Sequence, residues 1–463
     1  MAENNNTDKS RRRFLRNIGI FSAAGALASC GAPTGEEKAE VKDSTGQMTM
    51  RTNHNTGDTV SLLGYGCMRF PTIGMRDGTE DETLDQEAIN KSVDYALEHG
   101  VNYFDTSPAY CKGNSEAAIG EALSRHPRDK YYIATKLSNF SPSTWSYEES
   151  VKMFENSLKY LRTDYVDYLL LHSVGGGGLK KLHDRYLDNG VLKYLQEKRE
   201  KGVIRNLGFS FHGDIEVFDY LLRQMDEGNM HWDFVQIQLN YVDWKPSEED
   251  KPLSTNANYL YKELEKRNIP VVIMEPLLGG RLASLSEPIT RQLKERRPDD
   301  SVASWAFRFA GTEPGILTVL SGMTYMEHLI DNINTYSSLE PLTDEEKTFL
   351  HRIAVEYTEN KIVPCTACNY CMPCPYGVDI VGIFQHYNKC INENNLPRDY
   401  SDPRYAEARK AFLYGYDQSV PRLRQAGMCV GCDTCIPHCP QEIKIPKELR
   451  KIDKYAEDLR GEA

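Results

Sequence analysis

The chain has 463 residues, with 67 acidic against 55 basic side chains and a formal net charge of −12. This balance excludes nucleic acid as an expected partner, because binding to phosphate needs clustered basic side chains. The length leaves room for more than one domain.

The first 30 residues have the composition of an export signal. Residues 10–16, SRRRFLR, match the twin-arginine pattern, and an apolar stretch over residues 18–28 follows them. That stretch is too short for a transmembrane helix, which needs about 20 apolar residues. Residues 27–30, LASC, end it as a lipoprotein box does. We expect export by the twin-arginine route and a lipid anchor at Cys30, on the periplasmic face of the membrane. An ordinary signal peptide with an incidental cysteine is the alternative.

Residues 31–47 are polar, charged and rich in Pro, Gly, Glu and Lys, so we expect a flexible linker. Fold-forming sequence begins at residue 48. Residues 49–53 and 58–62 flank Thr56-Gly57, which predicts a β-hairpin.

Residues 48–340 alternate short apolar runs with longer amphipathic ones, such as residues 85–98 and 214–225. Eight strands with intervening helices predict a (β/α)8 TIM barrel, in which active-site residues come from the carboxyl ends of the strands. The predicted strands are Val60–Gly64, Val101–Asp105, Tyr131–Thr135, Tyr165–Leu171, Val203–Phe209, Phe234–Leu239, Val271–Met274 and Ile316–Leu320.

A doubly wound sheet is the alternative fold. It requires a glycine-rich turn directly after its first strand. Here residues 63–66, LGYG, lead into residues 67–70, CMRF, without a G-x-G-x-x-G pattern. The barrel is therefore the favoured prediction.

Polar residues follow several predicted strands. Asp105 ends the second strand, Lys136 follows the third and His172 the fourth, while Tyr110 lies five residues beyond Asp105. Taken one at a time, these residues are also explained as a helix cap, a surface lysine, a buried barrel histidine and a core tyrosine. Their joint placement at strand ends favours an active site.

The segments around these residues resemble the aldo/keto reductase family across the whole barrel. The resemblance implies that Tyr110 is a general acid or base, with Lys136 and His172 around its hydroxyl and Asp105 paired with the lysine. Tyrosine titrates near about 10, and we expect a neighbouring ammonium to lower that pKa. The matching segments are Phe104–Tyr110, Gly113–Glu116, Ala134–Lys136, Asp164–His172 and Gly202–Ser210.

The same resemblance implies a nicotinamide cofactor, NAD(P), and a carbonyl or alcohol substrate such as a sugar derivative. Ser210 and Gln236 stand where family members contact the nicotinamide carboxamide. Ser321, Gly322 and Asn332 stand in the segment that contacts its phosphate and adenine. No Lys or Arg lies between Ser321 and Asn332, so the choice between NAD and NADP stays open. We interpret the glycines of residues 175–178 as a flexible loop over the barrel mouth.

Residues 341–463 contain two cysteine runs, each followed by proline. The second run has the ferredoxin spacing C-x2-C-x2-C-x3-C-P, whose fourth cysteine ligates the other of two [4Fe–4S] clusters. The first has one residue fewer before its last cysteine. Zinc sites and disulfides are the alternatives. We predict a mostly helical ferredoxin-type domain with two clusters, as in the appendage on a subset of these reductases. The cysteines are Cys365, Cys368, Cys371 and Cys374 in the first run and Cys429, Cys432, Cys435 and Cys439 in the second.

Two classes of function follow. In the first, the chain is an exported oxidoreductase that interconverts carbonyl and alcohol groups by hydride transfer, with a redox partner for its clusters. In the second, it is a non-catalytic iron–sulfur electron-transfer or scaffold protein whose barrel has lost turnover. The presence of Asp105, Tyr110, Lys136 and His172 together favours the enzyme.

Overall fold

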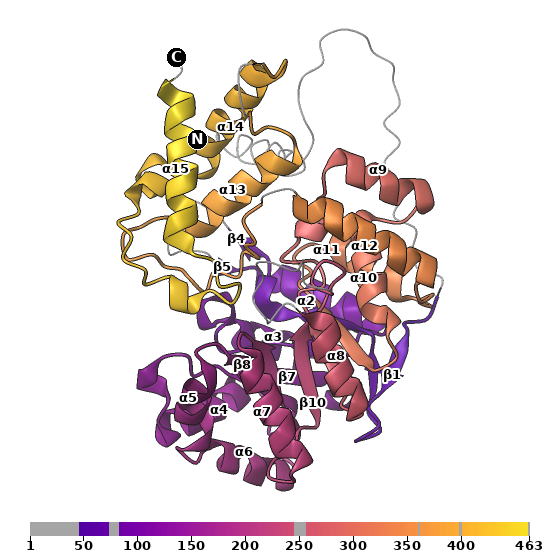
Figure 1. Ribbon diagram of the computed structural model, residues 1–463. Coiled ribbons are helices and arrows are strands. Elements are labelled where there is room, and N and C mark those ends of the chain that lie inside the picture. The colour runs from indigo at the N-terminus through magenta and orange to yellow at the C-terminus, as the bar shows by residue number, and fades with distance from the viewer. Residues whose placement is uncertain (1–45, 74–82, 245–255, 360–361, 398–400, 462–463) are drawn as a thin grey trace, which may run out of the picture. The chain divides into compact units, whose positions relative to one another are not determined.

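The computed structural model describes residues 46–73, 83–244, 256–359, 362–397 and 401–461 (Figure 1). These residues belong to one compact unit, Asp43–Ala463. The predicted export signal, the lipid anchor at Cys30 and the linker up to residue 45 lie outside the described residues. Within the described part of the chain, no helix combines the length and the apolar character needed to cross a membrane.

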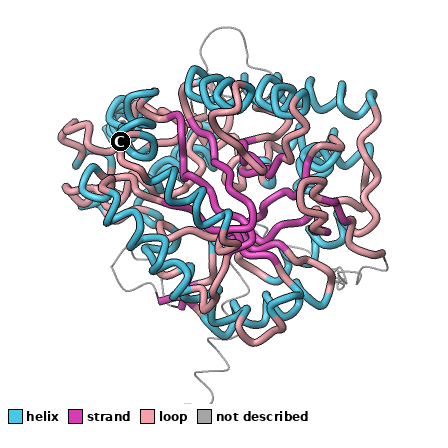
Figure 2. The backbone as a smooth tube through the Cα atoms, turned by 90° about the horizontal axis from the view of Figure 1, so that it is seen from below, coloured by secondary structure: helices cyan, strands magenta, loops and turns pink. Residues whose placement is uncertain are grey.

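Eight parallel strands close into a barrel, in the order β10-β11-β12-β3-β6-β7-β8-β9. This confirms the predicted eight-stranded barrel, and Figure 2 shows its strands gathered between surrounding helices. Side chains from most of the strands, such as Tyr103, Tyr168 and Phe234, fill the interior. The barrel strands are β3 Leu63–Gly66, β6 Tyr103–Asp105, β7 Tyr132–Leu137, β8 Val166–Gly175, β9 Ile204–His212, β10 Phe234–Gln238, β11 Val271–Met274 and β12 Ile316–Ser321.

The barrel helices begin where the sequence provides capping side chains. Asp85, Ser146 and Asp214 each accept a backbone N–H from the first turn of the helix that follows. The helices are α2 Gln86–Glu98, α3 Ser115–Leu123, α4 Tyr147–Tyr160, α5 Gly178–Leu182, α6 Val191–Glu200, α7 Ile215–Asp226, α8 Ala257–Lys266, α9 Glu287–Arg296, α10 Val302–Thr312, α11 Met326–Tyr336 and α12 Asp344–Glu359.

The predicted hairpin is confirmed as β1 Met50–Thr52 paired antiparallel with β2 Thr59–Ser61. The first barrel strand begins later than predicted, because Val60 pairs with Arg51 in the hairpin and barrel pairing starts at Leu63. A further small sheet pairs β4 Thr72–Ile73 with β5 Thr83–Leu84.

The glycines of residues 175–178 do not form the single loop that we expected. Gly175 ends β8 and pairs with His212 of β9, whereas Gly178 begins α5. A Cβ at Gly175 would lie 2.4 Å from the His212 carbonyl oxygen, and its φ is +112°. Glycine is needed there because the two strands approach too closely for any side chain.

The C-terminal residues form a second, helical core. Its helices are α13 Ile380–Asn392, α14 Tyr405–Ser419 and α15 Ile445–Gly461, and its buried side chains begin at Val363. The prediction of a mostly helical C-terminal region is confirmed to that extent. Helix α12, which the predicted boundary at residue 340 assigns to this region, packs instead on the barrel core through Phe349, Leu350 and Ile353. The domain bounds themselves stay a prediction.

Candidate active site

The structure brings together the four strand-end residues singled out in the sequence. Asp105 is the last residue of β6, Lys136 lies in β7, His172 lies in β8, and Tyr110 opens a short helical turn after β6. All four are buried. The Lys136 ammonium donates to Asp105 Oδ1 at 2.5 Å and to the Thr106 carbonyl at 2.9 Å. Its Nζ atom lies 4.8 Å from the centre of the Tyr110 ring.

His172 completes the group from the next strand. Its Nδ1 atom lies 2.6 Å from Ser138 Oγ, and its ring stands edge-on to the Tyr110 ring with 6.0 Å between centroids. Burial lowers the pKa of His172 well below its ordinary value, and the charges of Lys136 and Arg185 add to that effect. The imidazole is therefore neutral at physiological pH and available for hydrogen bonding.

The expected lowering of the Tyr110 pKa is wrong for this structure. Burial raises the pKa of Tyr110 well above its ordinary value, and the neighbouring Tyr370 and Asp105 add to the rise. Desolvation, which disfavours the charged phenolate, is the largest of these effects. Tyr110 is therefore a protonated phenol, which can donate a proton to a reacting oxygen.

The Lys136–Asp105 pair is shielded from solvent on both sides. Burial raises the pKa of the Asp105 carboxyl and lowers that of the Lys136 ammonium, while their mutual attraction opposes both shifts. Among the described residues, Asp105 Oδ2 has no hydrogen-bond partner. The pair is buried, and its Lys136 end lies beside the Tyr110 ring.

The residues expected at the nicotinamide lie on neighbouring strands. Gln236 of β10 is paired in register with Ser210 of β9, and Ser210 Oγ accepts the Ser173 N–H at 2.8 Å. Gln236 Oε1 is buried and has no hydrogen-bond partner among the described residues. A buried acceptor without a donor is costly. It fits a ligand that brings an N–H group, as a carboxamide does.

The residues expected at the phosphate and adenine also meet. Asn332 of α11 donates to Ser321 Oγ at 3.0 Å, at the end of β12. A Cβ on Gly322 would lie 3.1 Å from Arg69 Cδ, so the Arg69 side chain crosses this segment. Sequence reasoning looked for a cation only between Ser321 and Asn332 and missed Arg69. Only the pairing of β12 with β3 places it there.

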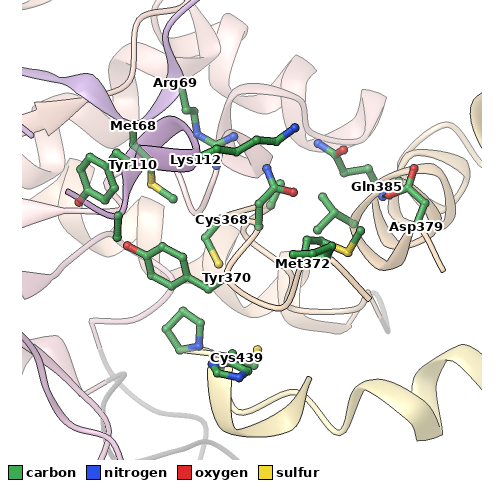
Figure 3. Close-up of a pocket in the computed structure, with 18 of the residues that line it drawn as sticks. Met68, Arg69, Tyr110, Lys112, Cys368, Tyr370, Met372, Asp379, Gln385 and Cys439 are labelled. Carbon is green, nitrogen blue, oxygen red and sulfur yellow. The ribbon is translucent and has the colours of Figure 1, made fainter. Parts of the chain in front are cut away.

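A cavity of about 1420 Å³ opens onto this site. Barrel residues such as Tyr110, Phe140 and Arg185 line it together with Cys368 and Tyr370 of the first cysteine run, and Figure 3 shows part of this lining. Tyr370 is a second residue that sequence reasoning missed. Its place between two cysteines gave no sign that it reaches the barrel.

The eight C-terminal cysteines are free thiols, so none forms the disulfides left open by the sequence. In the described part of the chain, no three His, Cys, Asp or Glu side chains converge in a way that would hold a metal ion. The two runs nonetheless approach each other. Cys371 and Cys374 of the first run line a cavity of about 240 Å³ together with Cys429, Cys432 and Cys435 of the second.

The fourth cysteine of each run lies near the other run. The charge of Cys439 acts on Cys365 and Cys371, whose thiol pKa values are raised chiefly by burial. Cys374 acts in the same way on Cys435, whose pKa burial raises to about 11. Cys439 thus lies near Cys365 and Cys371, and Cys374 lies near Cys435.

Comparison with known proteins agrees with the barrel fold. Residues 63–354 match the aldo/keto reductase family. L-galactose dehydrogenase of Arabidopsis thaliana is 25% identical over 318 residues, which are 65% of this chain and 92% of that protein. D-arabinose 1-dehydrogenase of Saccharomyces cerevisiae is 36% identical over 137 residues, which are 28% of this chain and 38% of that protein.

Among solved structures, an aldo-keto reductase of Klebsiella pneumoniae in complex with NADPH superposes with a TM-score of 0.50 at 20% identity. The match covers 67% of this chain and 95% of that one. At this identity the likeness concerns the fold. Because the family match spans more than half of the sequence, the chain belongs to the aldo/keto reductase family.

Proposed function

We propose that the chain interconverts carbonyl and alcohol groups by hydride transfer, with Tyr110 as the acid and base. The observation that carries this proposal is the meeting of Tyr110, Lys136, Asp105 and His172 at the carboxyl end of the barrel. The alternative of a barrel without turnover is not favoured, because all four side chains are present and assembled.

In the reducing direction, a nicotinamide held here would provide the hydride that the carbonyl carbon accepts. The Tyr110 hydroxyl gives its proton to the carbonyl oxygen, which becomes the alcohol. The Lys136 ammonium stabilises the phenolate that remains, and Asp105 keeps the ammonium in place. The neutral His172 imidazole directs a hydrogen bond at the reacting oxygen. Oxidation of an alcohol reverses each of these steps.

The nicotinamide is held, in this proposal, by residues that fit its groups. The partnerless Gln236 Oε1 accepts from the carboxamide N–H, with Ser210 beside it. Arg69, Ser321 and Gly322 would bind phosphate. The aliphatic stem of Arg69 lies against Gly322, and its guanidinium, which donates to the Thr366 carbonyl, supplies the positive charge. The NADPH complex of the Klebsiella pneumoniae structure supports a dinucleotide of this class. Because Arg69 can pair with a 2′-phosphate, the proposal includes NADP beside NAD.

A sugar derivative is the proposed class of substrate. Two of the relatives are named as dehydrogenases of the sugars L-galactose and D-arabinose. The large cavity, which Tyr110 lines, has room for a substrate of that size.

We also propose two [4Fe–4S] clusters, each ligated across the two runs. Cys365, Cys368, Cys371 and Cys439 form one set, and Cys429, Cys432, Cys435 and Cys374 form the other. A cubane is wider than one ion, so its thiols need not converge on a point. Such clusters pass single electrons to and from a redox partner.

The experiment that tests the proposed activity is a substrate screen on anaerobically purified protein. We expect NADPH or NADH to be consumed with at least one member of a panel of aldehydes, ketones and oxidised sugars, measured by loss of nicotinamide absorbance. Mass analysis of any cofactor released on denaturation identifies the physiological one. Turnover with a one-electron donor alone, and none with either nicotinamide, would contradict the proposal.

Export to the periplasmic face is a proposal that rests on residues outside the described part of the chain. Replacing both Arg11 and Arg12 by lysine should leave folded protein in the cytoplasm, because that route reads the arginine pair. Cys30→Ala should still allow export but release the product from the membrane. Cell fractionation with immunoblotting measures both, and Arg13→Lys, next to the pair, is the matched control. Normal export of the double lysine variant would show that another route is used.

A further inference from the structure

Tyr370 connects the first cysteine run to the reductase site. It stands between Cys368 and Cys371, and its hydroxyl lies 3.5 Å from His172 Nε2. It is also close enough to Tyr110 for the two phenols to interact electrostatically. Residues 365–376, which contain the first cysteine run, are called the cysteine stretch below. Figure 3 shows the Tyr370 side chain directed from this stretch toward Tyr110.

The contact falls on the face of His172 that a substrate must reach. His172 Nδ1 forms a hydrogen bond with Ser138 Oγ at 2.6 Å. Nε2 is therefore the ring nitrogen that can form a hydrogen bond with a reacting oxygen. That nitrogen faces the hydroxyl of Tyr370 instead. In this structure Tyr370 therefore holds the place of a substrate oxygen beside His172.

The ring of Tyr370 also shields His172. Its centroid lies 5.8 Å from that of Phe140 and 6.3 Å from that of His172, and Phe140 lies 4.8 Å from His172. Within the described chain, Tyr110, Phe140 and Tyr370 line the large cavity, whereas His172 does not. Tyr370 and Phe140 thus separate His172 from the cavity.

The position of Tyr370 is set by contacts on both of its sides. Arg69 donates to the Thr366 carbonyl at 2.5 Å. A Cβ on Gly279, whose φ is +69°, would lie 2.2 Å from the same carbonyl oxygen. Backbones this close leave no room for movement of the cysteine stretch toward the barrel. On the other side, the Met372 N–H donates to the Asn369 carbonyl at 3.0 Å and closes a turn around Tyr370.

We propose that Tyr370 is a specificity-determining residue that closes the reductase site over His172 and limits the size of the carbonyl compound that reaches Tyr110. This inference deepens the proposed function and rests on it for the substrate. The cysteine stretch, a part added to the barrel, supplies the outer wall of the site. A substrate enters by displacing the Tyr370 hydroxyl from His172 Nε2.

The first test needs no substrate. Diethyl pyrocarbonate modifies accessible imidazoles, and peptide mass spectrometry follows His172 against the exposed His54 as internal reference. We expect His172 to react at least about tenfold faster in Tyr370→Ala than in the parent protein, since the side chain covers it. Tyr376→Ala, which removes an exposed tyrosine of the same stretch, is the matched control and should leave the rate unchanged. Equal rates in Tyr370→Ala and the parent would overturn the proposal.

The second test uses two aldehydes of different size, glycolaldehyde and naphthaldehyde. Tyr370→Ala should raise the ratio of kcat/KM for the large over the small aldehyde by about tenfold or more, and Tyr370→Trp should lower it. If Tyr370 had only a structural role, both variants would show a lower kcat/KM for both aldehydes. That result would overturn the proposal that Tyr370 limits substrate size. Iron content, measured for every variant, excludes damage to the cysteine stretch. If His172 reacts faster with diethyl pyrocarbonate in Tyr370→Ala but no variant reduces any aldehyde, the proposed reductase function is wrong. The proposal that Tyr370 covers His172 is then still supported.

Discussion

Replacing Tyr110 by phenylalanine is expected to lower kcat for carbonyl reduction by about 10²–10⁴-fold. In the proposed mechanism the phenol donates the proton beside the buried Lys136 ammonium, and phenylalanine keeps the ring but has no proton to donate. Binding of the nicotinamide and the iron content should stay at the parent values. Steady-state kinetics on the best substrate of the screen measures kcat. Fluorescence titration with the nicotinamide measures its binding separately.

Tyr103→Phe is the matched control for this variant. Tyr103 is buried in the barrel interior, and its hydroxyl has no hydrogen-bond partner among the described residues. Loss of that hydroxyl should leave kcat within about twofold of the parent, because no hydrogen bond is broken. If Tyr110→Phe reduces the substrate as fast as Tyr103→Phe does, the acid–base role of Tyr110 is wrong.

The pH dependence follows from the direction of the Tyr110 shift. Because the pKa of Tyr110 is raised, the phenol stays protonated through neutral pH, and reduction should fall only as the pH rises through that raised pKa. Oxidation needs the phenolate and should gain rate as the pH rises. A reduction rate that falls already near neutral pH would contradict the raised pKa in the working enzyme.

The second large effect concerns the cysteines. The parent protein should contain about eight irons and eight acid-labile sulfides per chain, as two cubanes require. Cys439→Ala should lose about half of both, because one cluster loses a ligand. The double variant Cys439→Ala with Cys365→Ala should lose no more than the single variant, since the proposal assigns both thiols to one cluster. Cys439→Ala combined with Cys429→Ala should lose nearly all the iron.

If instead Cys439→Ala with Cys365→Ala loses nearly all the iron and Cys439→Ala with Cys429→Ala loses only about half, each cluster is ligated by its own run. Cys390→Ala is the matched control, because Cys390 is buried in the same helical core but lies outside the runs. Its iron content should equal that of the parent. Stoichiometric zinc without acid-labile sulfide in the parent protein would contradict the clusters altogether.

The sequence by itself determined the barrel and the strand-end residues of its site. Parallel strands that are buried on both faces require continuous apolar runs, so all eight were visible as such. A barrel turns the carboxyl ends of its strands to one side, so the sequence alone predicts that Asp105, Lys136 and His172 meet. The hairpin was predictable because its turn residues are local.

The tertiary structure decided what depends on contacts between distant segments. Val60 belongs to the hairpin because it pairs with Arg51, and an apolar run in the sequence does not reveal this pairing. Arg69 reaches Gly322 only because β3 and β12 are neighbours in a closed barrel. The pKa of Tyr110 rises because the packed site removes the phenol from water, and burial of this kind depends on the tertiary structure.

Tyr370 is the clearest case, since 198 positions separate it from His172, which its hydroxyl contacts. A sequence pattern records spacing along the chain, whereas the wall of an active site depends on which surfaces pack together.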